Sequence, residues 1–129
     1  MAKPILFMLT PWVEGNDQGP FYCPDCALVE GFFAYTPAVR DQIEIISVDF
    51  QRPRKKVVDS LGMENQSCPV LVLEDGAMPP KGAKKSLSTG RVFIDDPDLI
   101  CRYLGERFKA ILPHTRSSGP VNAHPPCSS

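Results

Sequence analysis

The sequence predicts an α/β fold in which a mixed four-stranded sheet is flanked by helices. Short apolar runs are typical of buried strands, and helical segments separate the first three of them. A Cys-x-x-Cys motif at residues 23–26 stands where the first helix is expected to begin. The predicted order is β-α-β-α-β-β-α, which implies one domain over residues 1–112. Residues 113–129 shift to Ser, Gly, Pro, His and Asn and predict a disordered tail.

A loop separates the first strand from the first helix. Residues 4–9 form a continuous apolar run, as expected of a strand buried on both faces. Residues 10–22 are rich in turn-forming residues and predict a long loop. The helix is expected to begin at Cys23, because Pro24 suits the first helical position. It should end near Tyr35, just before a Thr-Pro pair.

The middle of the chain continues this alternation. Residues 44–50 are apolar and β-branched and predict the second strand. Residues 54–61 predict a short helix that a proline opens and Gly62 ends. Residues 68–74 predict the third strand, and an Asp-Gly turn follows it. The alternation implies a parallel pair of strands, and the turn implies an antiparallel pair after it.

The predicted domain closes with a loop, a short strand and a helix. Residues 77–90 are polar and predict a loop, and residues 91–94 predict the fourth strand. Asp96 stands at the expected cap of the last helix. Residues 97–108 carry apolar side chains along one side of that helix, which should therefore pack on the sheet.

Composition and charge argue against several classes of protein. A formal net charge of −1 argues against a general nucleic-acid binder. The basic group at residues 52–56 is interpreted as the exposed face of a helix. No apolar stretch approaches the ~20 residues that span a bilayer, and the N-terminal run lacks the cleavage site of a secretion signal. The sequence therefore predicts a cytoplasmic protein whose partner is neither nucleic acid nor a membrane.

The cysteines carry most of the chemical information. There are five, at positions 23, 26, 68, 101 and 127, too widely spaced for a secreted disulfide scaffold. Two thiols three residues apart at a helix start lie on one side of the first turn, which suits a reversible disulfide or two ligands to a soft metal. The positive end of the helix dipole would favour the thiolate form of Cys23. Cys101 falls among apolar residues and is interpreted as part of the core.

Three segments resemble the thioredoxin-like superfamily, in particular the glutaredoxins and the N-terminal domain of glutathione transferases. Residues 21–26, Phe-Tyr-Cys-Pro-Asp-Cys, are similar to the glutaredoxin active-site segment. Residues 67–71, Ser-Cys-Pro-Val-Leu, stand where that family carries a cis-proline before a strand. Residues 96–104 resemble the helix start that binds the γ-glutamyl end of glutathione. The chain also resembles a small bacterial family of such domains.

This resemblance implies a thiol–disulfide oxidoreductase of glutaredoxin or thioredoxin type. Cys23 would attack a substrate disulfide, and Cys26 would resolve the mixed disulfide. The substrate-binding residues that the resemblance implies are Tyr22, Cys68, Pro69 and Asp96. The partner would be a disulfide-containing protein or glutathione, the latter as a co-substrate, with no other cofactor. Pro97 replaces the serine of the glutathione-binding dipeptide and so removes a hydroxyl and an amide donor.

The sequence allows three roles for Cys68, because this residue precedes the expected cis-proline and should lie close to the Cys-x-x-Cys pair. It could exchange disulfides with Cys23 or Cys26. It could complete a three-thiolate metal site, or it could pack against the sheet as a small apolar residue.

Two alternatives to the oxidoreductase follow. The first is a metal-binding domain that holds zinc or iron through Cys23, Cys26 and Cys68. The second is a non-catalytic interaction module that keeps the fold and makes no use of its thiols, since a fold does not determine an activity.

Overall fold

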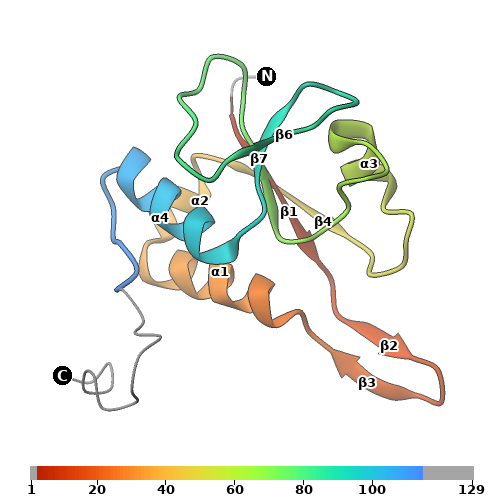
Figure 1. Ribbon diagram of the computed structural model, residues 1–129. Coiled ribbons are helices and arrows are strands. Elements are labelled where there is room, and N and C mark those ends of the chain that lie inside the picture. Colours follow the sequence, from red (N-terminus) through yellow and green to blue (C-terminus); the bar gives the residue numbers. More distant parts are fainter. Residues whose placement is uncertain (1–2, 115–129) are drawn as a thin grey trace, which may run out of the picture.

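The computed structural model describes residues 3–114 as a five-stranded mixed sheet with helices on both faces (Figure 1). The strands of this sheet are β1 (Ile5–Leu9), β4 (Glu44–Val48), β5 (Val70–Val72), β6 (Lys84–Lys85) and β7 (Val92–Ile94). They lie in the order β4-β1-β5-β7-β6. The α/β class is confirmed. The sheet has five strands where four were predicted, because the short β6, within the expected loop, pairs with β7.

Strand β1 occupies the centre of the sheet. It pairs in parallel with β4 on one side and antiparallel with β5 on the other. β7 is antiparallel to both of its neighbours, so the expected parallel pair is followed by antiparallel strands. In the register, Leu9 lies opposite Val48 and Phe7 lies opposite Val70. The carboxyl end of β1 therefore lies beside the segment that leads into β5.

The core forms two layers, one on each face of the sheet. The helices are α1 (Pro24–Tyr35), α2 (Pro37–Arg40), α3 (Lys55–Leu61) and α4 (Pro97–Arg107). Helices α1 and α4 cover one face of the sheet, and α3 covers the other (Figure 1). Because side chains alternate along a strand, Leu6 and Met8 pack with α1 and α4, whereas Phe7 packs with α3. Burying each such side chain stabilises the fold by about 1.5–3 kcal/mol.

Residues 10–22 form a hairpin and not the loop that the sequence predicts. β2 (Trp12–Glu14) pairs antiparallel with β3 (Gln18–Phe21), and the hairpin extends away from the sheet (Figure 1). Asn16 and Asp17 have positive φ angles of 42° and 59°, which the tight turn requires and which these residue types tolerate. The Trp12 ring stacks on Phe50 with centroids 4.2 Å apart, and this contact ties the hairpin to the chain that follows β4.

The helix ends follow the expected local signals. α1 ends at Tyr35, and the amide of Thr36 donates to the carbonyl of Phe32 at 3.1 Å. The single-turn α2, absent from the prediction, begins at the next proline. Asp96 is the N-cap of α4, and its carboxylate accepts the Leu99 amide at 2.8 Å. β5 is shorter than predicted, so the segment before it belongs to a loop.

The C-terminal residues 115–129, most of the predicted tail, lie outside the described residues together with Cys127. Within residues 3–114, none of the helices has the length and apolar character needed to cross a membrane.

The segment after α4 folds back against Gly105, inside that helix. A Cβ atom at this position would lie 2.0 Å from the carbonyl oxygen of Ile111 and 3.0 Å from Cδ2 of Leu112. The backbone would therefore have to move to admit a side chain. Gly31 in α1 offers the opposite case, because a Cβ there would have no neighbouring atom within 4 Å.

We expect Gly105→Ala to lower the free energy of unfolding by about 1–3 kcal/mol, because the methyl group overpacks against the returning chain. Gly31→Ala is the matched control. It should raise the free energy of unfolding by up to about 1 kcal/mol, because alanine has a higher helix propensity than glycine. Denaturant unfolding followed by circular dichroism measures both values. Equal stabilities of the two variants would contradict the packing of residues 111–112 against α4.

Candidate functional site at the three cysteines

The N-terminus of α1 holds the first thiol. Cys23 is the N-cap residue, with extended backbone angles, and Pro24 takes the first helical position. The Cys26 amide donates a hydrogen bond to Sγ of Cys23 at 3.2 Å. Free amides and the helix dipole concentrate positive potential at this point. Cys23 itself is buried, at 9% exposure, and the adjoining Tyr22 is 69% exposed.

Cys26 lies one turn into the helix and faces the sheet. Its side chain is only 5% exposed and packs in the core layer beneath α1. The backbone amide of Leu9, the last residue of β1, donates to its Sγ at 3.5 Å. Burial raises the pKa of Cys26 to about 12 despite this hydrogen bond. Cys26 is therefore a protonated thiol at neutral pH.

The loop before β5 brings the third thiol to the same place. The peptide bond between Cys68 and Pro69 is cis. The Cys23 thiol lies 3.9 Å from the carbonyl oxygen of Cys68, to which it can donate. Pro69 is buried, and the Cys68 side chain is partly exposed. The structure thus brings together Cys23, Cys26, Cys68 and Pro69, four of the six residues expected to form the site.

Arg54 is a site residue that the sequence did not reveal. It belongs to the basic group interpreted as exposed, yet its side chain is only 7% exposed. The guanidinium donates to the Phe50 carbonyl at 2.7 Å and to the Gln66 carbonyl at 2.7 Å. Burial raises the pKa of Cys68 to about 11, and the positive charge of Arg54 opposes this rise.

The remaining expected residues have structural surroundings of their own. The Asp96 carboxylate caps α4, and Pro97 occupies the first position of that helix. Cys101 is 2% exposed within α4, as expected of a core residue, and burial raises its pKa to about 12. Within residues 3–114, the His, Cys, Asp and Glu side chains form no group of three or more that could hold a metal ion.

A basic cavity lies at the end of β4. It has a volume of about 350 Å³ and is lined by the end of β4 and the chain leading into α3. Arg54 forms part of its wall, and the charge of the same residue lowers the pKa of Cys68. Arg52 and Lys56 contribute further positive charge, so an anionic group would be favoured in this cavity.

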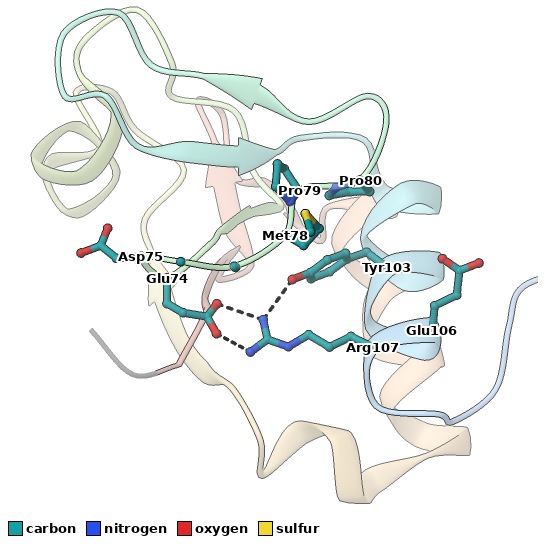
Figure 2. Close-up of a pocket in the computed structure, with 10 residues that line it drawn as sticks. Glu74, Asp75, Met78, Pro79, Pro80, Tyr103, Glu106 and Arg107 are labelled. Atoms are coloured by element: carbon teal, nitrogen blue, oxygen red, sulfur yellow. Dashed lines mark hydrogen bonds and ion pairs between the residues drawn. The ribbon is translucent and has the colours of Figure 1, made fainter.

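Another cavity lies at the other end of β5. It has a volume of about 620 Å³ and is drawn in Figure 2. Arg107 pairs there with the Glu74 carboxylate and donates to the Tyr103 hydroxyl at 3.0 Å (Figure 2). Glu74 and Cys68 flank β5 on opposite ends, about 20 Å apart at the usual rise of a strand. The polar groups of this cavity thus stabilise the fold and do not contact the thiols.

We expect Glu74→Gln to destabilise the protein at neutral pH, because the Arg107 guanidinium holds the pKa of Glu74 below its usual range. A lowered native pKa contributes stability above the unfolded-state value, and this contribution is lost as pH falls through the native value. The difference in Tm between wild type and variant should therefore shrink in acid. Asp75→Asn, at an exposed neighbour, is the control. A difference that stays constant with pH would contradict this linkage.

We expect iodoacetamide to modify Cys23 in the native protein at neutral pH and to leave Cys101 unmodified, because burial keeps Cys101 both protonated and inaccessible. Peptide mapping by mass spectrometry distinguishes the two sites. Unfolding in urea is the control and should expose Cys101. Rapid native labelling of Cys101 would mean that α4 does not pack as described.

Comparison with known proteins gives one match. A model of the family DUF3088, described as a protein of unknown function, matches residues 3–111. Searches of the curated proteins and of the solved structures found no match. The matched segment contains every strand and helix described above, together with the three clustered thiols. The chain therefore belongs to the DUF3088 family.

Proposed function

We propose that this protein is a thiol–disulfide oxidoreductase with a thioredoxin-like fold, in which Cys23 is the nucleophile and Cys26 the resolving thiol. The observation that carries the proposal is the hydrogen bond from the Cys26 amide to Sγ of Cys23 at the start of α1. The free amides of a helix N-terminus can hydrogen-bond the sulfur that attacks a disulfide.

The order and direction of the strands support the thioredoxin-like assignment. A parallel pair, β1 and β4, is joined through α1, and two antiparallel strands, β5 and β7, follow. The cis bond before Pro69 lies beside the thiol pair, as the sequence resemblance implies. The added β6 and the β2–β3 hairpin lie outside this common arrangement.

The two thiols have different environments, and these suit two different steps. The Cys23 thiolate attacks one sulfur of a substrate disulfide, and the other sulfur leaves as a thiolate. Cys26 then loses its proton and attacks Sγ of Cys23, which releases the reduced substrate and closes the Cys23–Cys26 disulfide. The Leu9 amide that points at Sγ of Cys26 stabilises the negative charge that develops in this step. Burial keeps Cys26 protonated until then, so it does not compete for substrate.

The substrate class is a protein disulfide or a glutathione mixed disulfide. The exposed Tyr22 and the partly exposed Cys68 offer contacts to either. The positive charge at Arg52 and Lys56 favours an acidic substrate. The Asp96 carboxylate already accepts a helix amide, and Pro97 has no amide hydrogen. A protein disulfide is therefore the better-supported substrate. The free thiols of Cys23, Cys26, Cys68 and Cys101 suit the reducing cytoplasm.

We expect Cys23→Ser to abolish the reduction of a protein disulfide such as that of insulin, because no other thiol within residues 3–114 receives the amide at the start of α1. Cys101→Ser is the matched control and should retain activity, since that thiol lies in the core. The assay follows turnover with a small dithiol or reduced glutathione as the electron donor.

Two results would overturn this function. Wild-type protein whose Cys23 alkylates no faster than an ordinary thiol, and which turns over no disulfide, would favour a non-catalytic interaction module. Zinc or iron that co-purifies and protects Cys23, Cys26 and Cys68 from alkylation would favour a metal site.

A further inference from the structure

The proposed two-thiol cycle makes no use of the thiol of Cys68. Cys68 nevertheless lies beside the nucleophile, because its carbonyl oxygen is 3.9 Å from Sγ of Cys23. By standard bond lengths this places Sγ of Cys23 within about 6 Å of the Cys68 Cα atom. A disulfide joins cysteines whose Cα atoms lie about 4.4–6.8 Å apart. A movement of the loop before β5 that turns the Cys68 side chain toward Cys23 would therefore bring the two sulfurs together.

Cys68 is also more accessible than the thiol assigned to resolution. Cys26 is buried under α1 in the core layer, whereas the Cys68 side chain is partly exposed at the junction of the two core layers. A substrate linked to Cys23 must lie on the exposed side of the site. Cys68 borders that side and Cys26 does not.

A buried cation acts on Cys68 and not on Cys26. The Arg54 guanidinium is held by the carbonyls of Phe50 and Gln66, and its positive charge opposes the effect of burial on the pKa of Cys68. Cys26 has only a neutral amide for this purpose. The pKa of Cys68 is about 11 and that of Cys26 about 12. A negative charge on Cys23 raises both values, and this contribution disappears once Cys23 is in a neutral mixed disulfide.

We propose that Cys68 is a second resolving thiol, which attacks the mixed disulfide on Cys23 and closes a Cys23–Cys68 disulfide. This inference rests on the proposed oxidoreductase function and adds a catalytic residue to it. Arg54 is a positioning residue, because it acts through the thiol of Cys68.

The electrons balance over two exchanges. In the first, the Cys23 thiolate forms a bond to one sulfur of a substrate disulfide, and the other sulfur leaves as a thiolate. In the second, the Cys68 thiol loses its proton to solvent and attacks Sγ of Cys23, and the second substrate sulfur leaves as a thiolate. One substrate disulfide is reduced by two electrons, and two protein thiols are oxidised. Cys26 remains reduced and can displace Cys68 from Cys23 in a further exchange.

The test uses full-length Cys26→Ser protein and the aromatic disulfide dithiobis-nitrobenzoate, which releases one coloured thiolate for each exchange. Cys127→Ser is included in every chain, so that only cysteines of the described region can respond. With Cys68 present we expect two coloured thiolates per protein, and peptide mapping should find Cys23 linked to Cys68. With Cys68→Ser added, we expect one thiolate and a stable aromatic adduct on Cys23.

The outcomes separate this inference from the proposed function. In one outcome, Cys26→Ser releases one thiolate and keeps its adduct, while the chain with Cys26 releases two. Cys68 then does not resolve the mixed disulfide on Cys23, and the proposed function stands. If the chain with Cys26 reacts no faster than Cys23→Ser, both fail. Should Cys26→Ser not fold, peptide mapping of the oxidised chain with Cys26 decides. Because Cys26 can displace Cys68, the mapping uses samples quenched with acid during the reaction. A Cys23–Cys68 linkage that precedes Cys23–Cys26 supports the inference. If no such linkage forms at any time, and adding Cys68→Ser leaves the release of the second thiolate unchanged, the inference is overturned.

Discussion

The pairing of β1 on both of its edges is the constraint on which the thiol site depends. Because β1 is parallel to β4 and antiparallel to β5, its carboxyl end meets the end of β4 and the start of β5. The β1–β5 register ends with Phe7 opposite Val70, so the chain that carries Cys68 enters the sheet near the carboxyl end of β1. The Leu9 amide then reaches Sγ of Cys26 from the adjoining helix. A slip of one residue in this register would turn every side chain of β1 to the other face and separate the three cysteines.

Burial and local positive charge act differently on these thiols. Cys23 receives an amide at a helix terminus and lies next to an exposed aromatic residue. Cys26 sits in the core, where loss of solvation favours the protonated thiol. Cys68 is intermediate, since burial opposes ionisation and the Arg54 guanidinium promotes it. Position alone thus gives Cys26 and Cys68 different tendencies to ionise.

Arg54 shows how the fold supports this chemistry from outside the motif. Burying a guanidinium is unfavourable unless its donors are satisfied. The carbonyls of Phe50 and Gln66 provide that compensation, and the Gln66 side chain accepts the Arg54 amide at 2.7 Å. The same contacts tie the chain after β4 to the chain before β5. The stacking of Trp12 on Phe50 extends this connection to the hairpin that leads into α1.

Local signals determined much of what could be predicted. The α/β class, the start of α1 at Cys23 and the Asp96 cap of α4 depend on periodicity and capping within a few residues, and the sequence by itself determined them. The sequence predicted a loop in place of the β2–β3 hairpin. Trp12 and Phe21 pair across the hairpin, but the segment between them is polar and rich in turn residues, which is typical of a loop. The burial of Arg54 and the approach of Cys68 to Cys23 were decided only by the tertiary structure. The physical reason is that Cys23 and Cys68 are 45 residues apart, so only the β1–β5 register brings them together.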